Sequence, residues 1–184
     1  MEQALVLASI VLGVGIAFEL ENLNRVLRSP QVRWHWAQPL FALLVLLTII
    51  SYWWGLARNP DGAITIGEFL PIMFDLVLLV LLAAASLPEK VGEEGGDLAA
   101  YYQANRRYQW ILLTLFFWAV NLRWMSGVWT EASGIGKFLS VIAVDATAGL
   151  VVFAMIFVKR WWMVALGFAI LSLGPVVWIG RTLG

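Results

Sequence analysis

The chain has no cysteine and a single histidine, His35, among its 184 residues. Without thiols it forms no disulfide, no thiolate metal site and no cysteine nucleophile. One histidine also excludes a bis-histidine haem or a histidine-rich metal site within the chain. The sequence contains no nucleotide-binding loop, no Gly-x-Ser-x-Gly and no His-Glu-x-x-His pattern. We therefore expect a protein that is not an enzyme and that carries no metal and no cofactor.

Charge is also scarce. Only 13% of the residues are charged, against about 25% in soluble domains. The formal net charge is zero and the pI is near 6.6, so no nucleic-acid partner is indicated. Hydrophobic residues make up 61% of the chain, and the mean hydropathy is +0.83. This composition is typical of a polytopic protein whose main partner is the lipid bilayer.

The apolar residues fall into six stretches, each near the roughly 20 residues that a helix needs to cross a membrane. Few residues lie outside these stretches. We therefore predict an all-α, polytopic membrane protein with six transmembrane helices, forming a single domain over residues 1–184. The predicted spans are approximately 3–20, 37–56, 66–87, 108–125, 138–158 and 162–179.

Three boundaries have local signals. The first helix continues past its span to Arg28, supported by the pair Glu21 and Arg25 at a spacing of four, and Pro30 then stops it. The run from Phe138 to Ile179 would be about 60 Å long as one helix, so it must reverse, and we place the reversal at 158–162. Asp97 suits the N-cap of a helix over 98–107, which we expect to follow the membrane surface and bend into the fourth span.

Eight of the twelve Lys and Arg residues lie in the loops after the first, third and fifth spans. Basic loops stay on the cytoplasmic side. The sequence thus predicts a bacterial inner (plasma) membrane protein with both termini in the periplasm.

Each even-numbered span begins with a basic–aromatic cluster, such as Arg33-Trp-His-Trp36, and ends with aromatics near a cation. One interpretation is three repeated hairpins around a central pathway. The other is that every helix running from inside to outside needs a positive inner flank and aromatic belts.

Four carboxyl groups lie within or beside the predicted spans. Asp75 is near the middle of the third span and Asp145 near the middle of the fifth, while Glu19 and Glu68 lie nearer the ends of the first and third. An ionisable group in hydrocarbon costs about 2.5–3.5 kcal/mol on insertion scales, so each needs an explanation. These four residues are our candidate ion or proton pathway.

Arginines are available only near the span ends. Arg123 is at a suitable depth for Glu68, and Arg107 could approach Glu19, but no Lys or Arg lies at the depth of the two aspartates. Three interpretations stay open for Asp75 and Asp145: a proton or cation site, a structural hydrogen bond to a neighbouring helix, or a pair with another subunit. Structural partners within the chain would be Asn121, Thr114, Thr147 and Ser86.

Small residues indicate where helices approach closely. Ser9, Gly13 and Ala17 form a ridge along the first helix, and Ala143, Ala146 and Gly149 form a second ridge in the fifth. We predict a homo-oligomer, with a symmetric dimer favoured. The first ridge would lie at a helix contact inside the subunit or at the dimer interface.

Two segments resemble a known group. The run Asp97-Leu-Ala-Ala-Tyr-Tyr-Gln-Ala-Asn-Arg-Arg107 and the segment Tyr52-Trp-Trp-Gly-Leu56 resemble a group of uncharacterised bacterial six-helix inner-membrane proteins. The resemblance covers the middle half of the chain and implies the fold and the compartment, without an activity.

The leading hypothesis is a small channel or transporter for a cation or proton. The alternative is a non-catalytic membrane subunit, sensor or scaffold of a larger membrane complex.

Overall fold

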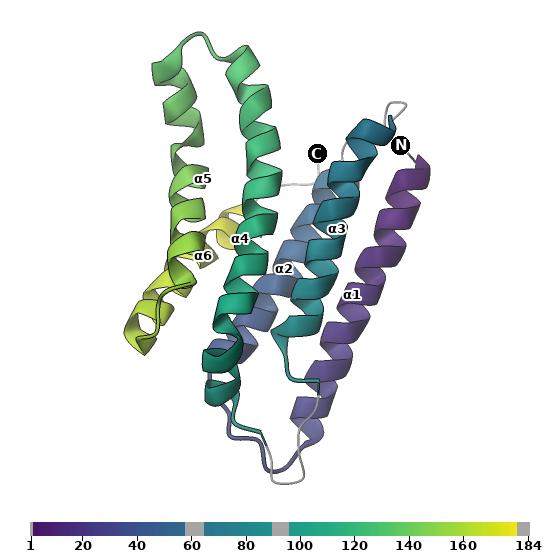
Figure 1. Ribbon diagram of the computed structural model, residues 1–184, viewed down its shortest axis with the longest axis vertical. Helices are drawn as coiled ribbons and strands as arrows, with labels where there is room; N and C mark the ends of the chain where they lie inside the picture. Colours follow the sequence, from purple (N-terminus) through teal and green to yellow (C-terminus); the bar gives the residue numbers. More distant parts are fainter. Residues whose placement is uncertain (1, 58–64, 90–95, 180–184) are drawn as a thin grey trace. The chain divides into compact units, whose positions relative to one another are not determined.

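The computed structural model describes residues 2–57, 65–89 and 96–179. In these ranges the chain is helical, with no strand, as the composition predicts (Figure 1). The helices are α1 (Glu2–Arg28), α2 (Ala37–Ala57), α3 (Ile66–Ser86), α4 (Leu98–Glu131), α5 (Ile135–Met155) and α6 (Trp161–Ile179).

Five of these helices, α1 to α5, are long and apolar enough to cross a bilayer, so the fold is that of an all-α, multi-pass membrane protein. For α6 the apolar stretch over Trp161–Gly174 is shorter. The helix predicted at 162–179 is therefore present, whereas its crossing of the membrane stays a prediction.

The helix boundaries follow the local signals closely. Helix α1 ends at Arg28, before Pro30, and the side chains of Glu21 and Arg25 form the predicted ion pair at 2.7 Å. The chain reverses between Met155 and Trp161, where the predicted turn was placed. No glycine or proline is needed there, because the N–H groups of Ile156 and Phe157 bond back to carbonyls of the last turn of α5.

Helix α4 differs from its predicted form. The expected surface helix over 98–107 and the fourth span are one continuous helix of 34 residues. At 1.5 Å per residue it is about 51 Å long, well beyond the roughly 30 Å of a hydrocarbon core. The polar first part of α4 thus prolongs the span without a break in the helix.

The chain divides into two compact units, unit 1 (Met1–Gln109) and unit 2 (Trp110–Gly184). The first twelve residues of α4 belong to unit 1 and the rest to unit 2. A single domain over the whole chain stays a prediction.

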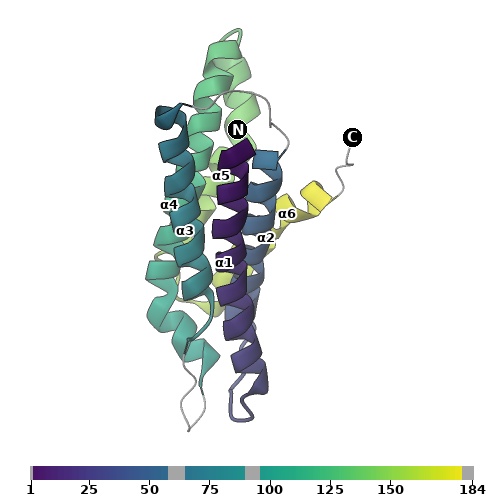
Figure 2. The ribbon, with the colours of Figure 1, turned by 90° about the vertical axis from the view of Figure 1, so that its right-hand side faces the viewer.

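Unit 1 is a bundle of α1, α2 and α3, which lie side by side in Figures 1 and 2. Helix α1 packs mainly against α3 and less against α2, and the three-hairpin arrangement stays a prediction. The buried residues of α1 recur at alternating spacings of three and four, which is typical of helices packed at a shallow crossing angle. They are Ala8, Leu12, Gly15, Glu19, Asn22 and Val26.

Helices α1 and α3 approach each other closely at Gly15. A Cβ atom placed there would lie 3.7 Å from Ala83 Cβ and 3.7 Å from Val80 Cα, so the helices meet where a side chain is absent. Gly13, in the predicted ridge, is instead exposed, with no atom within 4 Å of such a Cβ. Ala17 is also exposed, and exposed Ser9 accepts a hydrogen bond from Trp53 Nε1 at 3.0 Å.

Within the subunit, Ser9 of the predicted ridge contacts α2, whereas Gly13 and Ala17 are exposed. The contact predicted for Gly13 is made by Gly15, on the neighbouring face of the helix, because the buried stripe of α1 runs through position 15. A dimer interface at Ser9, Gly13 and Ala17 stays a prediction.

Unit 2 contains the remainder of α4 with α5 and α6. Gly134 precedes α5 with a φ of +152°, a conformation that favours glycine, and the turn brings Trp129 and Phe138 into edge-to-face contact at 5.0 Å. Gly149, from the second predicted ridge, is buried against the rings of Trp118 and Phe117.

Two contacts join α6 to other helices of unit 2. Trp110 and Phe168 lie 5.5 Å apart between ring centroids, and Gly167 lies against the thioether of Met155.

Candidate functional site

The C-terminal turn of α3 is surrounded by polar side chains from the other helices of unit 1. The last four carbonyls of a helix have no donor within the helix, and a buried carbonyl needs one. Gln38 of α2 donates from Nε2 to the carbonyl of Ser86, and Gln109 of α4 donates to that of Ala85 at 2.8 Å. The Tyr101 hydroxyl lies 3.3 Å from the carbonyls of both Ala85 and Leu87. Side chains from two helices thus cap a third.

Glu19 of α1 lies at the same level. Its side chain is 3% exposed, and neither carboxyl oxygen has a hydrogen-bond partner among the described residues. The Ser86 hydroxyl lies next to this carboxyl, but its single proton is donated to the carbonyl of Ala83 at 2.8 Å. Ser86 can thus donate either to Ala83 or to Glu19, and not to both.

The two glutamines leave further acceptors unused. Gln38 and Gln109 are both 0% exposed, and each donates its amide N–H while its Oε1 atom finds no donor in the described part of the chain. Together with Glu19 they make a layer rich in oxygen acceptors and poor in donors. We call Glu19, Gln38, Ser86 and Gln109 the acceptor layer.

An acceptor layer of this kind suits an occupant that supplies positive charge or protons. A buried carboxylate without a partner is strongly disfavoured, so Glu19 is either protonated or accompanied by a cation or water. Carboxylate and amide oxygens are also the ligands that hard cations prefer.

Asp75 lies on α3 at a second level. It is 0% exposed and accepts a hydrogen bond from the Tyr52 hydroxyl of α2 at 2.9 Å. A phenol donating to a buried carboxyl satisfies part of its need for donors. Asp75 thus makes a hydrogen bond to a neighbouring helix, as the structural interpretation expects. The donor is a tyrosine and not one of the four residues expected from the sequence.

An apolar layer separates Asp75 from the acceptor layer. Asp75 and Ser86 are eleven residues apart on α3, which corresponds to about 16 Å. Between them, the inner faces of the three helices carry apolar side chains that are at most 2% exposed. These are Leu12, Phe41, Val45, Ile49, Leu79 and Leu82. Unit 1 thus has two polar levels with a closed apolar layer between them.

The other predicted site residues have separate positions. Asp145 is half-buried on α5 and belongs to unit 2, whereas Asp75 and Glu19 belong to unit 1. Glu68 is exposed and forms a capping box with Thr65, in which Glu68 accepts from the Thr65 N–H at 2.9 Å. A local stabilising contact is thus established for Glu68, while its part in a pathway stays a prediction.

The predicted arginine partners are both exposed. Arg107 points away from the core of unit 1, and Glu19 has no partner among the described residues, so the expected Glu19–Arg107 pair is not formed. The arginine that α4 buries in unit 1 is the neighbouring Arg106, at 5% exposure. Arg123 lies in unit 2, so its predicted pairing with Glu68 of unit 1 stays a prediction.

Asp97 caps α4 as predicted. Its carboxylate accepts from the N–H groups of Ala99 and Ala100 at 2.8 and 3.0 Å. The bond from Ala100 lowers the pKa of Asp97 below its ordinary value, helped by the N–H of Ala99 and the nearby charge of Arg33. Arg33 also exchanges backbone hydrogen bonds with Gly96 and Leu98, which joins the segment after α1 to the start of α4.

Three site residues were not found from the sequence: Gln38, Gln109 and Tyr52. Each lies near the end of a predicted span, where polar and aromatic residues are expected for reasons of depth alone. The sequence signal that could have found the two glutamines is an uncharged amide just inside an otherwise apolar span.

No protein-family model matches the chain, and comparisons with curated proteins and with solved structures give no significant match. The function is therefore inferred from the chain's own geometry.

Proposed function

We propose that the chain is a non-enzymatic integral membrane protein that binds a proton or a small monovalent cation at the carboxyl groups of unit 1. The proposal is carried by Glu19, a carboxyl 3% exposed whose two oxygens have no partner among the described residues. Binding a positive occupant removes the cost of that arrangement. Movement through unit 1 would then require the apolar layer between Glu19 and Asp75 to open.

The second candidate is a non-catalytic subunit, sensor or scaffold of a larger membrane complex. The Tyr52–Asp75 hydrogen bond and the Glu68 capping box favour it, because both assign stabilising contacts to predicted pathway residues. In this case Asp145, half-buried on α5, would face a partner subunit.

Ion flux into proteoliposomes separates the two candidates. We expect proton or cation flux in the native chain that falls at least tenfold, about 1.4 kcal/mol in barrier, in Glu19→Gln. Asp75→Asn and Asp145→Asn test the other two membrane carboxyls. Glu21→Gln is the matched control, since Glu21 is an exposed carboxyl two residues away on the same helix. Absence of flux in the native chain, or full flux in all three variants, favours the subunit candidate.

We also propose the bacterial inner membrane and periplasmic termini, on the eight-to-four distribution of basic residues. Because the chain has no cysteine, a single introduced thiol is unique. Cysteine at Ser29 should react with an impermeant reagent only from the cytoplasmic side, and cysteine at Ser133 only from the periplasmic side. The reverse pattern would invert the topology.

The dimer is proposed on the exposed ridge of α1 and on the frequency of twofold assemblies. Native mass spectrometry in mild detergent tests it directly. A mass that stays near 20.5 kDa at all concentrations would show a monomer.

A further inference from the structure

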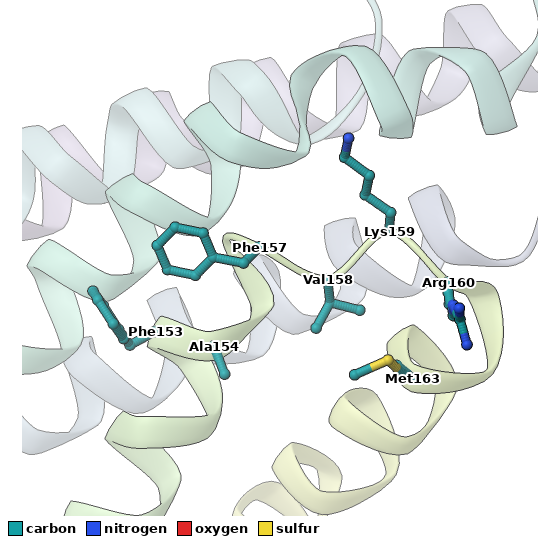
Figure 3. Close-up of a pocket in the computed structure, with 7 residues that line it drawn as sticks. All are labelled: Phe153, Ala154, Phe157, Val158, Lys159, Arg160 and Met163. Carbon is teal, nitrogen blue, oxygen red and sulfur yellow. The ribbon is translucent and has the colours of Figure 1, made fainter.

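A cavity of about 570 Å³ opens where α5 connects to α6 (Figure 3). Its lining comes from three places: the last turn of α5, the connecting segment, and the first turn of α6. In Figure 3 the rings of Phe153 and Phe157 lie on the α5 side, and Met163 lies on the α6 side. All of these residues belong to unit 2.

One wall of the cavity is apolar and well defined. Phe153 and Phe157 make an edge-to-face pair with centroids 5.6 Å apart, and Ala154 between them leaves the wall open. All three side chains are exposed, so this wall is presented to whatever surrounds the protein. A wall of this shape and composition suits a hydrocarbon chain.

The rim of the cavity is cationic. Lys159 and Arg160 leave the connecting segment in different directions in Figure 3, and both are exposed. The sequence contains no Asp or Glu after Asp145, so α5 beyond that point, the connecting segment and α6 add positive charge alone. The N-terminus of α6, which begins at Trp161, adds a partial positive charge at the same place.

An apolar wall beside a cationic rim is complementary to an anionic phospholipid, in which acyl chains adjoin a negatively charged headgroup. We propose that this cavity binds one anionic phospholipid, with its phosphate at Lys159 and Arg160 and an acyl chain along Phe153 and Phe157. Guanidinium groups bind phosphate through two parallel hydrogen bonds, and basic clusters at helix ends favour anionic over zwitterionic lipids. This inference is independent of the proton or cation site.

Native mass spectrometry with equal amounts of phosphatidylglycerol and phosphatidylcholine tests the proposal on the full chain. We expect the native protein to retain phosphatidylglycerol preferentially. Lys159→Gln and Arg160→Gln should each lower that preference about fivefold, the effect of one cation at a membrane surface. Ala154→Trp, which fills the space along the apolar wall, should reduce retention of both lipids.

Two control variants keep the outcome clear. Lys137→Gln removes an exposed cation from the opposite end of α5 and should leave the preference unchanged. Arg160→Lys should retain most of the preference, which guards against loss by misfolding. Equal retention of the two lipids by the native chain, or an unchanged preference in the Lys159→Gln/Arg160→Gln double variant, would overturn the proposal. Complete displacement of phosphatidylglycerol by inorganic phosphate would show a site for the free anion and would overturn it too.

Discussion

Unit 1 and unit 2 are both built from apolar helices but are held together differently. Seven of the eight buried polar side chains in the described part of the chain belong to unit 1, and the eighth, Thr114, bonds only within its own helix. In unit 1, hydrogen bonds and a glycine contact join the helices. In unit 2, the helices meet through aromatic and thioether side chains, two sets of which lie against glycines, Gly149 and Gly167.

This difference follows from the solvent. In lipid, an apolar side chain gains little by moving from hydrocarbon to protein, so apolar packing alone joins helices weakly. Buried hydrogen bonds and close backbone approach supply what the hydrophobic effect does not. Unit 1 should therefore be the more stable unit.

The largest expected effect is at the α1–α3 contact. Gly15→Leu should destabilise unit 1 by about 1–3 kcal/mol, because the new side chain would occupy the space of Val80 and Ala83. Unfolding in a detergent titration, followed by circular dichroism, measures the change.

Gly13→Leu is the control for this substitution, since it adds the same side chain to the same helix where no atom lies within 4 Å. If Gly13→Leu proves the more damaging of the two, the predicted ridge makes a contact beyond the single chain. Gly149→Leu in unit 2 should also be destabilising, because a Cβ atom there would already lie 2.7 Å from the Trp118 ring and 3.0 Å from the Phe117 ring, so both rings must move.

The sequence predicted the helices well and their packing faces less well. Length and hydropathy located all six helices, because an apolar run of this length has few other structures available in a membrane. The face that each helix turns inward is harder to predict when both its lipid-facing and its protein-facing sides are apolar. For this reason Gly13 was expected at a contact that Gly15 makes.

The next largest effect concerns the cap on α3. Gln38→Leu removes the amide that donates to the Ser86 carbonyl, and Gln109→Leu removes the donor to Ala85. Each should cost about 1 kcal/mol, since a buried carbonyl loses a donor. Thr114→Val in unit 2 should cost much less, because its hydroxyl bonds to Trp110 O within one helix turn. Equal losses in the two units would remove the distinction drawn between them.

The candidate site was predicted in part. Glu19 and Asp75 were recognised because a carboxyl in an apolar span is unusual. Their surroundings were not, since the donor to Asp75 is a tyrosine that also fits an aromatic belt, and the glutamines that cap the last turn of α3 lie at span ends. Which of two adjacent arginines faces inward, Arg106 or Arg107, depends on the rotation of α4.

Tyr52→Phe should have a smaller effect than either glutamine substitution. It deletes one hydroxyl and keeps the ring, so about 0.6 kcal/mol is expected, the average for hydrogen bonds between membrane helices. Asp75→Leu, which removes the acceptor, should then cost less in the Tyr52→Phe background than in the native chain, because the hydrogen bond is already absent there. Additive losses in this double-mutant cycle would show that the hydrogen bond contributes nothing to stability.

The smallest effect is expected at Asp97, outside the apolar layers, where α4 begins in unit 1. The Ala100 N–H holds the pKa of this carboxyl below its ordinary value. Its stabilising contribution is therefore complete above the ordinary pKa and is lost as the pH falls through the lowered value.

Asp97→Asn keeps an acceptor for Ala99 and Ala100, whereas Asp97→Ala removes it. Hydrogen exchange at these two amides should thus be faster in Asp97→Ala at all pH values. After correction for the intrinsic exchange rate, it should accelerate on acidification in the native chain but not in Asp97→Asn. The same acid response in both proteins would mean that another group controls the start of α4.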